Sequence, residues 1–221
     1  GIRPPMAEIA ARFSKRAGVK VVCDYAGSEV LLSRLRLSRQ GDIYMPGDIY
    51  YIAQAEEQGL ILSKRTACYF VPVILVPKGN PAKIRGLHDL TRPGVRLGLG
   101  DPQACAIGRK CLEIFRKAGI PFESIKRNIV FNSLTVRELG VHIKLGKIDA
   151  TIVWDAVAAY YSDCAEIIPI PPEQNVISTV AVGVLSFTRD RRLAERFADF
   201  VCSAEGMAIF RKYHYTTARP H

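Results

Sequence analysis

Short apolar runs alternate with helical patterns along most of the chain. Met6, Ile9 and Phe13, for example, recur at the spacing of a helix whose first turn holds Pro4 and Pro5. The predicted helices are 4–16, 28–37, 49–58, 87–90, 109–117, 134–145, 155–161, 191–202 and 204–213. The predicted strands are 19–25, 41–45, 70–76, 95–100, 129–131, 150–154, 166–170 and 176–185. This alternation, with connections of a few residues, predicts an α/β fold with mainly parallel sheets and helices on both faces.

Two long apolar strands, 70–76 and 176–185, bracket the middle of the chain. If the chain passes from one lobe to another at each of these strands, the segment between them forms one lobe. The segment before residue 70 then forms the other lobe together with the segment after residue 185. A ligand would then bind in a cleft between the lobes. One continuous domain fits the same strands equally well, so the pattern leaves both arrangements open.

Two strand-to-helix turns in the middle segment suit an anion. The turns Asp101–Arg109 and Asn132–Val136 each follow an apolar strand and lead into a helix. Free backbone N–H groups and the positive end of a helix dipole meet there, at the carboxyl ends of neighbouring strands. Neither turn carries a Walker-type lysine or a full dinucleotide glycine fingerprint, so we expect a small oxyanion rather than a nucleotide.

Composition and charge narrow the class of protein. The chain has 48% apolar and 24% charged residues, as ordinary globular proteins do. The net charge of +10 suits nucleic acid, an anionic membrane surface or a small anionic solute. The basic residues are spread along the chain without a tight basic run, which favours a solvated surface with a general attraction for anions.

The cysteines and histidines form no motif with chemistry of its own. The six cysteines are scattered without a Cys-x-x-Cys pair, and the four histidines do not cluster with them. A zinc site is therefore not expected, and the cysteines are spaced like small buried hydrophobic residues, although export would permit disulfides. No histidine joins a serine or cysteine nucleophile in a motif, so we expect no enzyme.

The chain opens at Gly1-Ile-Arg-Pro-Pro5, directly before a helix. No signal peptide stands at this end. An α/β domain seldom begins on a helix without a preceding strand. We therefore expect that a leader and a first strand are missing from this chain.

Segments throughout the chain resemble the periplasmic molybdate/tungstate-binding proteins of ABC importers, within the type II solute-binding fold. The order and spacing of the segments carry the resemblance more than any one of them does. The segments are Met6-Ala-Glu-Ile-Ala-Ala-Arg-Phe13, Gly18-Val-Lys-Val21, Tyr25-Ala-Gly-Ser28, Gly41-Asp-Ile-Tyr-Met-Pro-Gly-Asp48, Leu75-Val-Pro-Lys-Gly79, Gly98-Leu-Gly-Asp-Pro102, Ile152-Val-Trp154 and Ser203-Ala-Glu-Gly-Met-Ala-Ile-Phe210.

The resemblance implies two lobes, each a mainly parallel sheet flanked by helices, with the ligand cleft between them. Lobe I would hold residues 1–72 and 184–221, and lobe II residues 73–183. The family holds a tetrahedral dianion by serine hydroxyls, N–H groups at helix starts and often a tyrosine hydroxyl. The resemblance assigns the following residues to the ligand site: Gly1, Gly27, Ser28, Asp48, Cys105, Ala106, Ile107, Val136 and Trp154.

Two positions of this set depart from the family. Trp154 stands where the family often has tyrosine, although its indole N–H still donates one hydrogen bond. Gly1 stands at the family's first serine ligand, so that a hydroxyl is lost and only the backbone remains. Ser28 matches the family serine at the second helix start, while Asp48 fits a helix N-cap as well as it fits a ligand pocket.

The resemblance implies an extracytoplasmic binding protein that captures an oxyanion, molybdate or tungstate first, for an ABC permease. Sulfate or phosphate is an alternative ligand, and a ligand-sensing effector domain of the same fold is an alternative role. We expect a monomer that lies in the periplasm or is anchored outside the membrane. Apart from the bound oxyanion, we expect no cofactor and no metal ion. We also expect no nucleic-acid partner.

Overall fold

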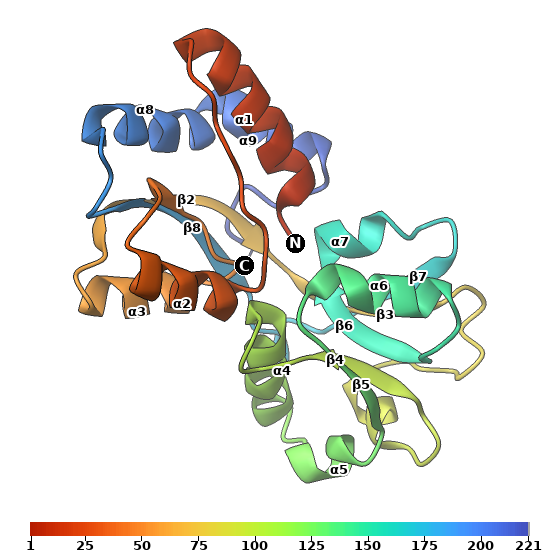
Figure 1. Ribbon diagram of the computed structural model, residues 1–221. Helices are drawn as coiled ribbons and strands as arrows, with labels where there is room; N and C mark the ends of the chain where they lie inside the picture. The colour runs from red at the N-terminus through yellow and green to blue at the C-terminus, as the bar shows by residue number, and fades with distance from the viewer. Residues whose placement is uncertain (221) are drawn as a thin grey trace. The chain divides into compact units, whose positions relative to one another are not determined.

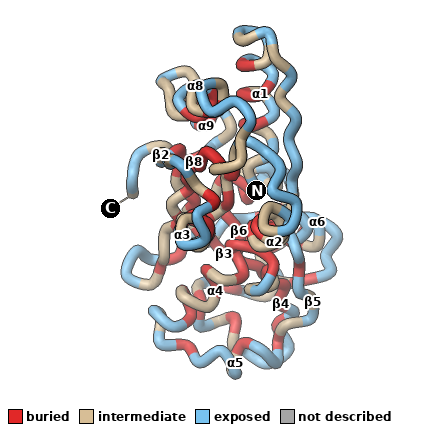
Figure 2. The backbone as a smooth tube through the Cα atoms, turned by 60° about the vertical axis from the view of Figure 1, so that its left-hand side comes forward, coloured by how far each residue is buried: buried red, intermediate tan, exposed pale blue. Residues whose placement is uncertain are grey.

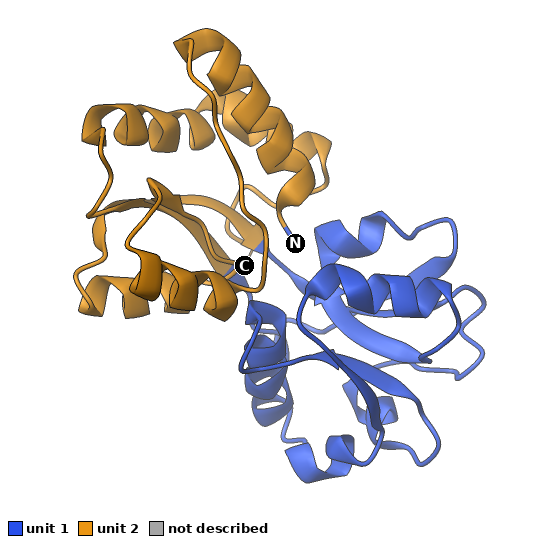
Figure 3. Ribbon diagram, viewed as in Figure 1, with its two compact units in different colours: residues 1, 70–178, 221 blue, residues 2–69, 179–220 orange. Residues whose placement is uncertain are grey.

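The computed structural model describes residues 1–220, which form two compact units (Figure 3). Unit 1 holds Gly1 and residues 70–178, and unit 2 holds residues 2–69 and 179–220. The chain therefore passes between the units after residues 1, 69 and 178. The two later passages lie a few residues before the lobe boundaries predicted after residues 72 and 183.

Unit 1 is built on a five-stranded sheet with the strand order β5-β4-β6-β3-β7 (Figure 1). Its strands are β3 (Pro72–Pro77), β4 (Leu97–Gly100), β5 (Ile129–Ser133), β6 (Ala150–Trp154) and β7 (Ala165–Pro169). Its helices are η1 (Leu87–Thr91), α4 (Ala106–Lys117), α5 (Phe122–Lys126), α6 (Val136–Lys144) and α7 (Asp155–Ala159). The central strands are buried along their length, and Figure 2 shows this in β3 and β6.

The expectation of mainly parallel sheets is wrong in detail, because the sheet of unit 1 is mixed. Strand β4 pairs in parallel with β5 and β6, whereas β3 pairs antiparallel with both β6 and β7. The apolar run of β3 is buried on both faces, like that of a parallel strand, so its hydrophobicity does not reveal its direction.

Unit 2 has a smaller sheet with the order β1-β8-β2. Its strands are β1 (Ile43–Tyr44), β2 (Ile61–Phe70) and β8 (Ser178–Leu185), of which Phe70 and Ser178 are counted with unit 1. Its helices are α1 (Arg3–Ala17), α2 (Ser28–Ser38), α3 (Ile49–Glu57), α8 (Arg191–Val201) and α9 (Ala204–Lys212). Helices α1, α8 and α9 lie on one side of β2 and β8, and α2 and α3 lie on the other (Figure 1). The Phe13 ring of α1 packs against Phe197 and Phe200 of α8, at centroid distances of 5.0 and 5.7 Å.

The predicted strand 19–25 is wrong, because these residues join no sheet within the described chain. Gly18 ends α1 with a left-handed backbone (φ 66°), and the chain then runs extended to α2. Val22 is 79% exposed, so the alternation of this segment buries no apolar face. Alternation describes two faces of a strand, but a strand also needs a neighbour for its backbone hydrogen bonds.

No helix within residues 1–220 combines the length and the apolar character that a membrane crossing needs.

Candidate functional site

The starts of the longer helices differ in how their free N–H groups are satisfied. Each of α3, α8 and α9 is capped by its own side chain: Asp48 accepts from Tyr50 N–H, Asp190 from Leu193 N–H and Ser203 from Gly206 N–H. In α1, α2, α4 and α6 no side chain caps the first turn. Because uncapped first-turn N–H groups need another acceptor, the starts of α2, α4 and α6 suit a bound anion. The start of α1 does not, since Pro4 and Pro5 in its first turn carry no N–H.

The loop before α4 is folded by Asp101. Its side-chain oxygen accepts from Gln103 N–H at 2.8 Å, and its carbonyl accepts from Cys105 N–H at 3.0 Å. Gly108 lets this loop lie against the first turn of α4, because a Cβ there would be 2.5 Å from the Asp101 carbonyl oxygen. The turn thus presents the first N–H groups of α4, those of Ala106 and Ile107, without a side-chain cap.

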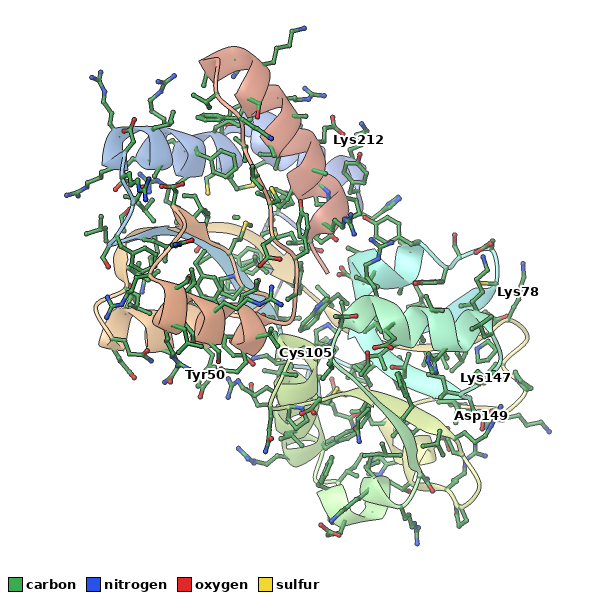
Figure 4. The ribbon with its side chains drawn as sticks, in the orientation of Figure 1. Tyr50, Lys78, Cys105, Lys147, Asp149 and Lys212 are labelled. Atoms are coloured by element: carbon green, nitrogen blue, oxygen red, sulfur yellow. The ribbon has the colours of Figure 1, made fainter. Side chains whose placement is uncertain are left out.

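Cys105 is a buried residue at the start of α4 (Figure 4). Burial raises the pKa of its thiol, although the neighbouring Gly108 N–H acts in the opposite direction. The thiol lies 3.5 Å from the Asp101 carbonyl oxygen and 3.7 Å from that of Ser133, and both oxygens accept from its S–H. Cys105 is therefore a protonated packing residue at neutral pH and not a thiolate nucleophile.

The second predicted turn lies beside the first. Asp101 N–H donates to the Ser133 carbonyl oxygen at 2.8 Å, which joins the end of β4 to the end of β5. The Ser133 hydroxyl bonds Glu138 of α6 at 2.5 Å and accepts from Thr135 N–H at 3.2 Å. Ser133 thus links two parts of unit 1: its carbonyl bonds the loop before α4, and its hydroxyl bonds the residues at the start of α6.

Gly1 and Trp154 meet Val136 on the other side of this turn. A Cβ placed on Gly1 would lie 3.1 Å from Val136 Cγ1 and 3.3 Å from Trp154 Nε1. Trp154 ends β6 and is only 2% exposed, with its ring centroid 4.9 Å from that of Phe70. The structure therefore brings together all six predicted residues of unit 1, in two neighbouring groups around the starts of α4 and α6.

In unit 2, Ser28 is the first residue of α2 and is 7% exposed. Its hydroxyl oxygen accepts from Gly47 N–H at 3.1 Å, and its carbonyl accepts from the Tyr44 hydroxyl at 2.7 Å. Because the hydroxyl oxygen already accepts a bond, the Ser28 O–H proton is directed to another acceptor. Ser28 therefore offers one hydroxyl donor next to the uncapped N–H groups of α2 that follow Gly27.

Asp48 is almost fully buried and acts as the N-cap of α3. It directly follows Gly47, the residue that holds Ser28. Asp48 thus has a structural role in unit 2, and its place in a ligand pocket stays a prediction.

The sequence does not reveal how Tyr44 and Gly47 support Ser28. From the sequence, Tyr44 is expected to be a surface or packing residue. It is 2% exposed, and burial raises the pKa of its hydroxyl. The sequence signal for them is the segment Gly41–Asp48 of the family resemblance, which contains both residues without giving their roles.

The basic residues beside α4 are balanced by an acid of the same helix. Glu113 pairs with Arg109 at 2.7 Å and with the buried Lys110 at 2.9 Å. The first turn of α4 therefore attracts an anion through its N–H groups more than through these side chains. Among the described residues, no group of three or more His, Cys, Asp or Glu side chains is placed to hold a metal ion.

Comparison with known proteins identifies the family. A family model described as bacterial extracellular solute-binding protein matches residues 1–216, and this chain belongs to that family. A binding protein of Haemophilus influenzae is 27% identical over 95% of this chain and 85% of its own length. The molybdate-binding protein of Mycobacterium tuberculosis is 27% identical over 87% of this chain and 72% of its own length.

The fold agrees with this family. The structure of the periplasmic molybdate-binding protein of Azotobacter vinelandii is 18% identical and superposes with a TM-score of 0.77, over 99% of this chain and 96% of that one. The predicted two-lobed, type II periplasmic binding protein fold is thereby confirmed, as is the resemblance to the molybdate-binding proteins.

Proposed function

We propose that this protein captures a tetrahedral oxyanion, molybdate or tungstate first, outside the cytoplasm and delivers it to an ABC permease. The observation that carries the proposal is the set of uncapped helix starts: α2, α4 and α6 lack side-chain caps on their first-turn N–H groups, while α3, α8 and α9 have them. The starts of α2, α4 and α6 hold six of the nine predicted ligand residues, namely Gly27, Ser28, Cys105, Ala106, Ile107 and Val136. The molybdate-binding relatives support the same ligand.

The expected strength of binding follows from the donors. A hydrogen bond to a charged group contributes about 1.5–3 kcal/mol. Roughly five such bonds outweigh an association cost of at least about 4 kcal/mol and allow tight binding without a salt bridge. The net charge of +10 further favours the approach of an anion.

The partners in this proposal are the anion and the membrane permease. The protein acts as a monomer, either in the periplasm or anchored to the outer side of the membrane. Sulfate and phosphate are the competing ligands, because both are tetrahedral and anionic at neutral pH. The size and protonation of the anion distinguish these ligands, so an anion panel separates them.

Thermal unfolding in the presence of sodium molybdate, tungstate, sulfate and phosphate tests the proposal. At a free ligand concentration a hundred times the Kd, binding stabilises the folded state by about 2.7 kcal/mol. For a chain of this size we expect the melting temperature to rise by about 5–10 °C with molybdate or tungstate. Sodium chloride at equal ionic strength is the control. Equal melting temperatures with all four oxyanions and with chloride would contradict the proposal.

A further inference from the structure

The start of α6 carries the sequence of a capping box, Thr135-Val-Arg-Glu138. In that motif the threonine hydroxyl accepts from the N–H of the glutamate, and the glutamate carboxylate accepts from the N–H of the threonine. Within residues 1–220 neither bond is formed: the side chain of the N-cap residue Thr135 makes no cap bond, and its N–H donates elsewhere. The sequence of the motif is therefore present without its two bonds.

The hydroxyl of Ser133 stands between the two residues of this motif. It accepts from Thr135 N–H at 3.2 Å and lies 2.5 Å from a Glu138 carboxylate oxygen. The Thr135 carbonyl oxygen, at 2.8 Å, is a second acceptor for the same proton, but the carboxylate is nearer and charged and is the stronger acceptor. Ser133 is 0% exposed and ends β5. The Glu138 carboxylate is thus attached to the end of a buried strand instead of to the N-cap residue.

The attachment decides where the charge of Glu138 lies. Glu138 is the acidic residue in the first turn of α6, where a negative charge interacts favourably with the helix dipole. An anion bound at the start of α6 would use the same end of the dipole, so the carboxylate and the anion repel each other. The distance between the carboxylate and the helix start therefore affects the affinity for an anion.

The backbone of Ser133 has a separate role in the neighbouring turn. Its carbonyl oxygen accepts from Asp101 N–H at 2.8 Å, and its Cα partner in the sheet register is Gly100 of β4. One residue thus holds the loop before α4 by its backbone and the acid of α6 by its side chain. A change of the side chain alone leaves the backbone bond to Asp101 in place, so the two roles can be tested separately.

We propose that Ser133 is a positioning residue of the anion site, whose hydroxyl holds the Glu138 carboxylate away from the N–H groups at the start of α6. Without this hydroxyl, Glu138 would complete the capping box with Thr135 N–H and bring its negative charge to the helix start. The inference rests on the proposed function, because it concerns the same anion. It goes further in assigning part of the affinity to two residues outside the nine predicted ligand residues.

The experiment uses the full chain, with sodium molybdate and sodium tungstate as probes in titration calorimetry at low salt. Ser133→Ala should weaken binding by about fivefold, the size of a charge effect at a helix start. Glu138→Gln keeps an oxygen that accepts from Ser133 and removes the charge, so it should strengthen binding by about twofold. Added to Ser133→Ala, the change Glu138→Gln should restore most of the affinity, because glutamine completes the capping box without a charge.

Two residues of α5 provide the matched controls within unit 1. Glu123→Gln removes one negative charge, and Ser124→Ala removes a hydroxyl that donates to the Pro121 carbonyl oxygen at 2.6 Å. Neither control should change the affinity by as much as Glu138→Gln does. The effect of Glu138→Gln should also shrink as sodium chloride rises from about 20 to about 500 mM, since salt screens the charge. This dependence needs no change at Ser133, so it decides the question even if circular dichroism shows that Ser133→Ala does not fold.

The outcomes separate the two proposals. If the native protein takes up neither molybdate nor tungstate in calorimetry, the proposed function is overturned. If the native protein binds, but Glu138→Gln binds no more tightly than Glu123→Gln at low salt, the role of the Glu138 charge is overturned and the function stands. If Glu138→Gln restores no affinity to folded Ser133→Ala, the positioning role of Ser133 is overturned, since a purely structural role predicts no recovery.

Discussion

Replacing Ser28 by alanine is expected to weaken molybdate binding by about tenfold to a hundredfold. The change removes the hydroxyl donor at the start of α2, and a hydrogen bond to an anion contributes about 1.5–3 kcal/mol. It also removes the hydrogen bond from Gly47 N–H to the Ser28 hydroxyl oxygen, which costs about 1 kcal/mol of folding stability. Titration calorimetry on the folded variant measures the change in affinity.

Ser33→Ala is the matched control for this change. Ser33 lies in the same helix, and its hydroxyl is 3.4 Å from a Glu29 carboxylate oxygen. Because it is remote from the helix start, its loss should leave the affinity unaltered. If Ser28→Ala and Ser33→Ala bound molybdate equally well, Ser28 would not be a ligand.

The second large effect concerns Gly108→Ala and the folding of unit 1. A Cβ at this position would collide with the backbone of Gly100 and Asp101, which has no side-chain end that could swing aside. Overpacking of this kind costs about 1–3 kcal/mol, so the melting temperature should fall by about 2–12 °C. The displaced loop should also weaken anion binding, since Ala106 and Ile107 begin α4 there.

Gly86→Ala is the control for the glycine change. Gly86 has an extended backbone (φ −179°), and a Cβ there would meet no atom within 4 Å. We expect a change of about 0.5 kcal/mol, clearly smaller than that of Gly108→Ala, because no neighbour has to move. Thermal and urea unfolding compare the two variants, and equal stability of both would refute the close approach at Gly108.

The sequence pattern predicted correctly those elements that consist of consecutive buried apolar residues. The strand at 150–154 is observed with the predicted bounds, because five consecutive buried residues carry it. Helix α4 begins at Ala106, three residues before the predicted start at Arg109, because the loop folded by Asp101 ends at Cys105. Boundaries set by such loop contacts are not encoded in periodicity.

Strand β2 was missed for a different reason. Residues 61–66 alternate between half-buried and exposed positions, and the polar Ser63 and Arg65 obscure the apolar side. Both side chains bond Glu195 of α8, at 2.9 and 2.8 Å. The partner lies about 130 residues away in the chain, so the strand is stabilised by a contact that no local window contains.

The candidate site shows the same division between local and distant causes. The resemblance to the family assigns Gly27 and Ser28 to the site from the sequence alone. The bonds of Gly47 N–H and the Tyr44 hydroxyl to Ser28 depend on tertiary contacts, and so they emerge only from the structure. The sequence thus predicts where an anion is favoured, but not which donors are already occupied.

The division of the chain into units has a consequence for the order of folding. Unit 1 is almost entirely one continuous stretch, residues 70–178, whereas unit 2 must join β2 to β8 across that stretch. Closing a loop over residues 70–178 costs more entropy than the short closures within unit 1. During refolding, backbone amides of β4 and β6 in unit 1 should therefore gain protection from hydrogen exchange before those of β2 and β8 in unit 2.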